Sequence, residues 1–154
     1  MKEIALTKGL AAIVDDEDYE EMSKHKWHYE GRTARRRLSV SEGGLNLQMH
    51  VQLMGTIRGL EVDHINGNPL DNRRENLRHV THAQNQYNRK PNKEGASQYK
   101  GVNWIRRGKP WRALIRTNGK LIHIGYYKSE AEAATAYNEA AIKHFGEYAR
   151  LNTI

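Results

Sequence analysis

An aspartate and a histidine stand next to each other in this sequence, at Asp63 and His64. Two asparagines follow His64, Asn76 after twelve positions and Asn85 after twenty-one. An imidazole titrates near neutral pH and can take a proton from water, and a carboxylate is a ligand for hard divalent cations. A lone histidine beside an aspartate is more often an ordinary polar pair. Together with the two asparagines, however, the pair points to metal-assisted hydrolysis.

The pattern around these residues predicts a strand, a loop, a second strand and a helix. The first strand ends at Asp63 and His64, and a tight polar loop continues to Asn72. Residues 72–75 begin a short helix with an Asx-type cap, and residues 77–80 form the return strand. A capping box at Thr81-His82-Ala83-Gln84 opens a helix to about Lys90. We expect Asn85, in its first turn and a half, to project back toward the strand that carries Asp63.

This arrangement resembles the HNH nucleases, whose core is a ββα-metal fold. Asp63-His64, Asn76 and Asn85 are similar, in type and spacing, to the motif of phage intron-encoded homing endonucleases, in which an asparagine replaces the last histidine. The β-rich stretch from Thr7 to Met54 also resembles the lead-in of these proteins, through Val14-Asp15-Asp16-Glu17-Asp18-Tyr19, Lys26-Trp27, Ala34-Arg35-Arg36 and Gln48-Met49-His50. Val51 departs from the pattern, because an arginine is expected there as a phosphate contact.

The resemblance implies a role for each residue, and the needs of phosphodiester hydrolysis agree with these roles. His64 is expected to be the base that activates water. Asp63 and the amide oxygen of Asn85 are expected to hold one divalent ion, and an oxygen-only ligand set favours Mg²⁺ or Mn²⁺. Asn76 is expected to accept a hydrogen bond from the other nitrogen of His64 and so fix its tautomer.

Other polar residues nearby leave alternatives open. His82 and His79 are the rival metal ligands, and His82 ranks below Asn85 because it would face partly sideways on the predicted helix. Three further asparagines are interpreted as turn residues only, namely Asn66, Asn68 and Asn72.

Length, charge and composition limit the classes of protein that this chain can be. Its 154 residues suffice for one ordinary domain or two small ones. A formal net charge of +7 and a sequence pI of about 9.7 favour a polyanionic partner, with nucleic acid first. The absence of cysteine excludes disulfides and cysteine-based zinc sites. No apolar run approaches the roughly 20 residues of a membrane span, so we expect a protein of the phage-host or bacterial cytoplasm.

The positive charge is concentrated in the second half of the chain. Residues 93–154 hold eleven Lys and Arg against five Asp and Glu, and the stretch from Gly95 to Ser129 holds eight basic residues and no acid. We therefore expect a nuclease domain over residues 1–90, with its ββα core at about 61–90, a linker over 91–97 and a second domain over 98–154. In the first half, the run Arg35-Arg36-Arg37 is a phosphate contact or a solvated strand.

The second half predicts three short strands covered by one helix. The strands are expected at 102–105, 111–117 and 121–125, with a tight hairpin at Asn118-Gly119. The middle strand alternates an apolar face with a largely basic one, Trp111, Ala113 and Ile115 against Arg112, Leu114 and Arg116. A capping box at Ser129-Glu130-Ala131-Glu132 opens the helix, which ends at Gly146 and covers the sheet with Ala134, Tyr137, Ala141 and Phe145.

This half resembles the DNA-binding domain of plant ethylene-response factors. The residues that carry the resemblance are Tyr99-Lys100-Gly101-Val102, Trp111-Arg112-Ala113-Leu114-Ile115-Arg116, Ile124-Gly125-Tyr126-Tyr127, Ala133-Ala134-Thr135-Ala136-Tyr137-Asn138-Glu139-Ala140-Ala141 and Ala149-Arg150-Leu151-Asn152. The resemblance implies that the exposed sheet face enters the major groove of DNA through Lys100, Asn103, Arg106, Arg107, Arg112, Arg116 and His123. The family's groove-facing Trp, Glu and Arg positions are here Leu114, Leu121 and His123.

These observations predict an α+β protein of two domains that acts as a metal-dependent, homing-type DNA endonuclease. Its partner is double-stranded DNA, and we expect a monomer whose one active centre cuts one strand per encounter. The alternative from another class is a transcription regulator that retains an inactive HNH remnant. An RNA-binding module is disfavoured, because the basic sheet has no row of exposed aromatic residues on which single-stranded bases could stack.

Overall fold

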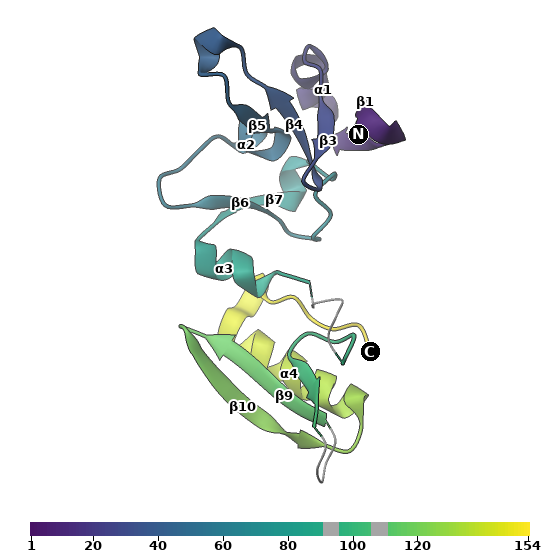
Figure 1. The fold of residues 1–154 in the computed structure, drawn as a ribbon, viewed down its shortest axis with the longest axis vertical. Helices are drawn as coiled ribbons and strands as arrows, with labels where there is room; N and C mark the ends of the chain where they lie inside the picture. The colour runs from purple at the N-terminus through teal and green to yellow at the C-terminus, as the bar shows by residue number, and fades with distance from the viewer. Residues whose placement is uncertain (91–95, 106–110) are drawn as a thin grey trace. The chain divides into compact units, whose positions relative to one another are not determined.

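The chain divides into two compact units, Met1–His82 and Ala83–Ile154. They are drawn in Figure 1 from a computed structural model that describes residues 1–90, 96–105 and 111–154. The division falls before the predicted linker, of which residues 91–95 lie outside the described ranges. Helix α3 (His82–Tyr87) ends in the second unit because the ring of Tyr87 stacks on Phe145, with 3.8 Å between ring centroids.

The first unit combines small antiparallel sheets with short helices. The pairings are β1 with β2, β3 with β4 and β4 with β5, and β6 with β7. The elements are β1 (Lys2–Ala5), the 3₁₀ helix η1 (Thr7–Gly9), β2 (Ala11–Val14), α1 (Asp16–Ser23), β3 (His28–Glu30), β4 (Thr33–Arg37), η2 (Val40–Glu42), β5 (Asn46–Gln48), α2 (Met49–Met54), β6 (Glu61–His64), η3 (Arg74–Asn76) and β7 (Leu77–Val80).

One hydrophobic core joins these sheets. Apolar side chains from β1, β2, α1, β4, α2 and β7 pack into a single cluster, to which Ile4, Val14, Met22, Ala34, Met49 and Leu77 belong. Trp27 is also buried there, and its indole Nε1–H donates to the carbonyl of Met22 at 2.7 Å. Because each sheet is too small to bury its own apolar face, the β-rich lead-in and the β6–β7 hairpin depend on one another for stability.

The hairpin of β6 and β7 has the predicted strands but a different turn at residues 72–76. The return strand has the predicted bounds, Leu77–Val80. The short helix is η3, which begins at Arg74 after Arg73, and it has no side-chain cap. The Asx-type cap predicted for Asn72 is therefore wrong, because the side chain of Asn72 is directed to His64 instead. Helix α3 ends at Tyr87 and is shorter than the helix predicted to reach about Lys90.

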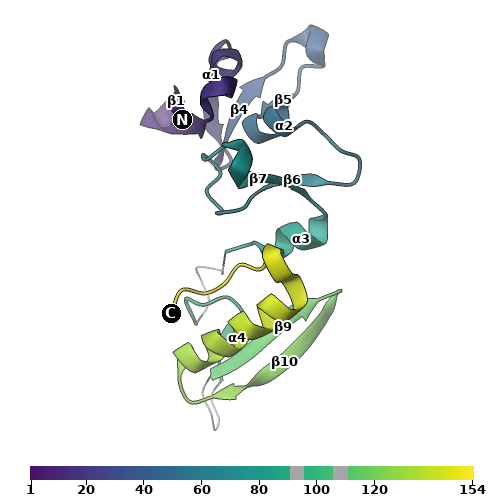
Figure 2. The same ribbon diagram turned by 180° about the vertical axis from the view of Figure 1, so that it is seen from behind.

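The second unit is a three-stranded antiparallel sheet with one long helix on one face. Strand β9 (Trp111–Thr117) is central, between β8 (Val102–Trp104) and β10 (Lys120–Tyr127). Figure 2 shows α4 (Glu130–Phe145) lying along the sheet, and the 3₁₀ helix η4 (Gly146–Tyr148) follows it. Within the ranges that the structure describes, no helix is both long and apolar enough to cross a membrane.

Local sequence signals mark the hairpin and the start of the helix as predicted, whereas β10 extends beyond the predicted 121–125 at both ends. Asn118 and Gly119 both have positive φ, 50° and 75°, as the two-residue hairpin requires. The Ser129 side chain accepts from the backbone N–H of Glu132, and the Glu132 carboxylate accepts in return from the N–H of Ser129. The four helix residues predicted to cover the sheet, Ala134, Tyr137, Ala141 and Phe145, are all buried.

Gly101, directly before β8, lies so close to the ring of Tyr137 and to the backbone of β9 that it leaves no room for a side chain. Its φ is +76°, and a Cβ built there would lie 2.1 Å from Cδ2 of Tyr137 and 2.6 Å from the carbonyl oxygen of Leu114. The N–H of Leu114 donates to the carbonyl of Gly101 at 2.8 Å, which holds the two backbones in place. Only glycine satisfies both the conformation and the space.

We therefore expect Gly101→Ala to lower the free energy of unfolding of the second unit by about 2–5 kcal/mol, from left-handed strain plus a clash. Gly119→Ala is the matched control, because Gly119 has a similar φ of +75° but nothing within 4 Å of its Cβ position. It should cost only the strain, about 1 kcal/mol. Denaturant unfolding of the two variants measures both values, and equal losses would contradict the close approach at Gly101.

Candidate functional site

Asp63 lies near the end of β6, directly opposite Arg78 of β7. Its Oδ2 accepts from Nε of Arg78 at 3.2 Å and from Nη2 at 3.0 Å. Asp63 is buried, and the side chain of Arg78 is largely buried too. The arginine offsets the charge of the carboxylate and fixes its orientation, as buried acids require.

His64, the next residue, is only 8% exposed. Its Nε2 lies 3.3 Å from Oδ1 of Asn72. A carbonyl oxygen can only accept, so Nε2 carries the hydrogen in this pair and Nδ1 is the nitrogen that can take up a proton. Burial lowers the pKa of His64, opposed in part by the Asn72 hydrogen bond and by the charges of Asp63 and Asp71. The ring is therefore neutral at pH 7, as a general base must be.

A second histidine, which the sequence did not single out as functional, packs against this ring. His50 of α2 is 6% exposed, and its ring meets that of His64 edge to face, with 4.7 Å between centroids and 75° between planes. Burial, followed by repulsion from His64 and Arg35, lowers the pKa of His50 to about 4. Its Nδ1 is buried and has no hydrogen-bond partner within the described ranges. In the sequence, His50 belongs to the Gln48-Met49-His50 segment, which resembles part of the lead-in of HNH nucleases. That resemblance implies no role for the histidine.

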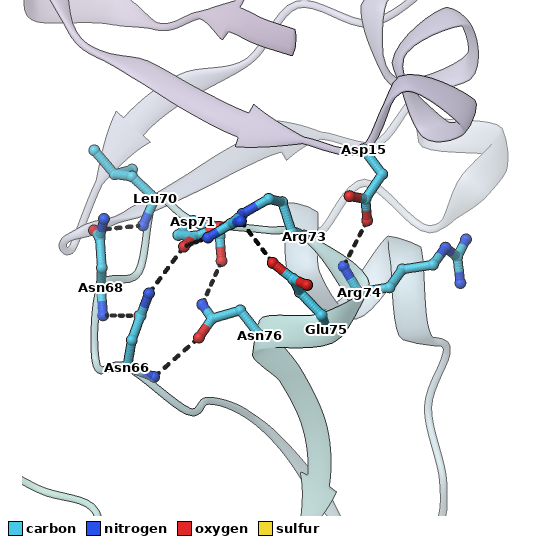
Figure 3. A network of polar contacts seen from close by, with 9 residues as sticks. All are labelled: Asp15, Asn66, Asn68, Leu70, Asp71, Arg73, Arg74, Glu75 and Asn76. Atoms are coloured by element: carbon cyan, nitrogen blue, oxygen red, sulfur yellow. Dashed lines mark hydrogen bonds and ion pairs between the residues drawn. The ribbon is translucent and has the colours of Figure 1, made fainter. Parts of the chain in front are cut away.

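Asn76 orders the loop after β6 instead of contacting His64. Its Oδ1 accepts from the backbone N–H of Asn66 at 2.9 Å, and its Nδ2 donates to the carbonyl of Asp71 at 2.8 Å (Figure 3). The hydrogen bond to His64 that was expected of Asn76 is made by Asn72, which was interpreted as a turn residue only. The reason is geometric, because the oxygen and the nitrogen of the Asn76 side-chain amide both bond to the backbone of the loop, at Asn66 and at Asp71.

Asp71 is the centre of the loop network in Figure 3. Its two carboxylate oxygens accept from Nε and Nη2 of Arg73 at 2.8 and 2.7 Å, and Oδ2 also accepts from Nδ2 of Asn66 at 2.8 Å. These hydrogen bonds, that of Arg73 above all, lower the pKa of Asp71. The side chain of Asn66 also accepts from the N–H of Asn68, so Asn66 and Asn68 serve the turn as predicted.

The loop is also fixed from outside, by the first residues of the chain. Ile13 of β2 donates its N–H to the carbonyl of Leu70 and accepts from the N–H of Asn72, both at 2.8 Å. The guanidinium of Arg74 donates to both carboxylate oxygens of Asp18 in α1, at 2.8 and 2.6 Å. The lead-in thus holds the loop that supplies the partner of His64.

The other predicted ligands differ in what surrounds them. Nδ1 of His82 lies 2.7 Å from Oε1 of Glu61, and Nε2 of His79 lies 3.2 Å from the carbonyl oxygen of Gly55. Both rival histidines therefore have partners other than Asp63. Asn85 lies on α3 in the second unit, so its role as a ligand stays a prediction.

The donor chemistry around Asp63 is compatible with a hard divalent cation. No group of three or more His, Cys, Asp or Glu able to hold a metal occurs among the residues that the structure describes. Mg²⁺ commonly uses only one or two protein carboxylates and completes its shell with water and substrate phosphate. A single buried carboxylate, oriented by Arg78, suits such a cation better than zinc, which prefers nitrogen and sulfur.

The outer face of the β8–β9–β10 sheet carries most of the residues predicted to contact DNA. Arg112 and Arg116 alternate with the buried Ala113 and Ile115, which confirms the two-faced pattern of β9. Arg112 pairs across the sheet with Asn103 of β8 and with Tyr126 of β10. His123 is exposed on β10, and Arg106 and Arg107 lie outside the described residues.

Lys100 differs from the other residues that were predicted to contact DNA, because its side chain is directed into the second unit. Its Nζ donates to the backbone carbonyl of Tyr87, and burial lowers its pKa to about 8. Its own backbone is held by Asn152, whose side chain accepts from the N–H of Lys100 at 2.7 Å. The ammonium of Lys100 therefore stabilises the packing of the second unit and is not directed to the outer sheet face.

Comparison with known proteins identifies the family. A family profile described as HNH endonuclease matches residues 55–87. The chain is 34% identical over 151 residues to the "Uncharacterized HNH endonuclease L560" of Acanthamoeba polyphaga mimivirus, across 96% of this chain and 77% of that protein. The chain belongs to the HNH endonuclease family. It is therefore a hydrolase that cleaves DNA.

Two further relatives match parts of this endonuclease. "Protein 3.8" of Escherichia phage T7 is 36% identical over 63 residues, 41% of this chain and 52% of that protein. "APETALA2-like protein 2" of Oryza sativa subsp. japonica is 40% identical over 57 residues, 37% of this chain and 13% of that protein. No solved structure matches the endonuclease significantly.

The separate contacts of Asn76 and Asn72 predict different losses in the endonuclease. Asn76→Ala removes its hydrogen bonds to the N–H of Asn66 and to the carbonyl of the buried Asp71, so the free energy of unfolding should fall by about 2–4 kcal/mol. Asn72→Ala should cost less stability, because its Nδ2 has no partner to lose within the described part of the chain. It should lower the cleavage rate roughly 10- to 100-fold by releasing the His64 ring. Unfolding and plasmid cleavage measure both, and wild-type cutting by Asn72→Ala would contradict the assignment.

The buried His50 predicts a loss of stability in acid. The unfolded chain protonates this ring at the ordinary value of 6.5, the folded chain only at about 4. Between these pH values the unfolded state binds more protons, so stability falls as the pH is lowered, by about 3 kcal/mol over the full window. His50→Phe should remove that part of the pH dependence. Denaturant unfolding at pH 7 and 4.5 tests this, and identical pH dependence in wild type and His50→Phe would refute it.

Proposed function

We propose that this chain is a divalent-metal-dependent, homing-type endonuclease in which residues 1–90 cut duplex DNA and residues 98–154 hold it. The observation that carries the proposal is the neutral, buried His64, held by Asn72 beside an arginine-bound Asp63 within the residues that match the HNH profile. A base with a lowered pKa and an oriented carboxylate are the two protein groups that phosphodiester hydrolysis needs.

His64 acts as the base in this proposal. Its Nδ1 takes a proton from the water that attacks phosphorus, while the Asn72 bond at Nε2 keeps the ring in the tautomer that leaves Nδ1 able to accept. Burial of the ring supports this role, because it keeps the imidazole neutral near pH 7. His50 limits rotation of the ring by packing edge to face on it.

Asp63 is the proposed protein ligand of one Mg²⁺ or Mn²⁺ ion, with Asn85 as the second ligand expected from the sequence. HNH nucleases in general depend on divalent metals, and when bound the ion would offset charge on the phosphate and on the leaving 3′ oxygen. Arg78 holds the Asp63 carboxylate in position for this role.

The second unit is the proposed duplex-binding domain. The absence of any acid between Gly95 and Ser129 supports this, together with Arg112 and Arg116 on an outer sheet face. The partial match to an APETALA2-like protein supports it further. The virus-encoded relatives favour action on DNA in the cytoplasm of a host cell.

Plasmid cleavage tests the catalytic part of the proposal. Supercoiled plasmid with Mg²⁺ or Mn²⁺ should give nicked circles first, and a chelator should abolish cutting. His64→Ala should lower the rate at least 100-fold with DNA affinity nearly unchanged, because it removes the base and no phosphate contact. The control is His144→Ala, at an exposed position of α4.

Three outcomes would contradict the proposal. Cutting by His64→Ala at the wild-type rate would overturn the assignment of His64 as the base. Full activity in the presence of the chelator would overturn the metal dependence. Tight binding of DNA by the wild type without cutting under any metal condition would favour the regulator with an inactive HNH remnant.

A further inference from the structure

The outer face of the β8–β9–β10 sheet presents apolar side chains among its basic ones. Leu114 of β9 lies between the buried Ala113 and Ile115 and so projects from the opposite face, where it is partly exposed. Leu121 of β10 is 55% exposed. Both positions are outside the two apolar clusters of the second unit, so packing within this unit does not account for them.

The strand register brings these leucines together between two arginines. Leu114 is paired with His123, and Leu121 with Arg116, in the antiparallel ladder of β9 and β10. Leu114 and Leu121 therefore occupy diagonal positions of one face, a separation that side chains of this size can bridge. Along β9, Arg112 and Arg116 lie two residues before and two residues after Leu114 on the same face.

The charges around the leucine pair favour DNA as the partner of this sheet face. In the described part of the chain neither Arg112 nor Arg116 forms an ion pair with an acid, although Nη1 of Arg116 donates to the carbonyl of Gly119 at 3.3 Å. Nε of Arg112 is buried without a hydrogen-bond partner there. The surrounding stretch of sequence holds no acidic residue. A neutral apolar partner would leave these cations uncompensated, whereas duplex DNA supplies phosphates at both ends of the leucine pair.

The major groove has one prominent apolar feature, the 5-methyl group of thymine. The leucine side chain can neither donate nor accept a hydrogen bond, so the favourable contact it can make with a base edge is an apolar one with this methyl group. We propose that Leu114 and Leu121 recognise thymine methyl groups in the major groove and thereby determine the site preference of the second unit. The inference rests on the proposed function of this sheet face as the duplex-binding surface.

The test is binding of the full-length chain to DNA in a chelator, which prevents cutting. Bound sites are first selected from a randomised duplex pool. Each thymine of the selected site is then replaced by deoxyuridine, which removes the methyl group and keeps the base pairing. At one or two positions the affinity of the wild type should fall roughly three- to tenfold, as expected for one buried methyl group.

Variants assign the effect to the leucines. Leu121→Ala and Leu114→Ala should bind the thymine site as weakly as the wild type binds its uridine form, and they should no longer distinguish the two duplexes. Ile142→Ala is the matched control, because Ile142 is an apolar side chain of α4 that is 56% exposed. It should retain wild-type discrimination. The uridine substitution needs no variant, so the test stands even where Leu114→Ala fails to fold.

The failure of this inference is distinguishable from that of the proposed function. Wild-type binding that is equally tight to thymine and uridine duplexes would overturn methyl recognition alone. Arg112→Ala and Arg116→Ala should weaken binding to both duplexes, and no effect from either would overturn the sheet face as the binding surface. A wild-type dimer that Leu121→Ala dissociates would instead make the leucine pair a protein interface and overturn the inference.

Discussion

The site depends on one constraint, which is that a polar loop must be held rigid with little apolar burial. The loop between β6 and β7 contains Asn66, Asn68 and Asp71, and hydrogen bonds replace the packing that fixes an ordinary core segment. Asp71 and Asn76 each bind two parts of the loop. His64 receives its partner Asn72 only because this network fixes the chain on both sides of it.

Burial then determines the electrostatics of the site. His64 and His50 lie in contact and are both buried, and burial is the main cause that lowers the pKa of each ring, with repulsion from His64 adding to the effect at His50. Asp63, the residue before His64, accepts hydrogen bonds from the guanidinium of Arg78. A neutral imidazole and an arginine-bound carboxylate thus arise on neighbouring residues of one strand, from differences in their surroundings alone.

Elements with strong local signals were predicted well, and contacts made across the loop were not. Strand β9 follows from alternation at Trp111–Thr117, and the start of α4 follows from the capping box at Ser129. Asn72 and Asn76 are chemically identical, and only the folded loop decides which one meets His64. In the same way, no local sequence signal indicates that His50, on α2, packs against His64. Nor does any local signal indicate that the ammonium of Lys100 donates to a backbone carbonyl.

The two hydrogen bonds of Ile13 have a consequence for the modularity of this nuclease. They join β2 to the loop as a parallel bridge, from a position more than fifty residues earlier in the chain. The matched span of residues 55–87 therefore contains the proposed base and metal ligands but not the backbone of β2 that positions the loop. Transplanted alone onto another DNA-binding protein, this span would carry the chemistry without its scaffold. A transplanted module that keeps this bridge must include β2 as well as the matched span.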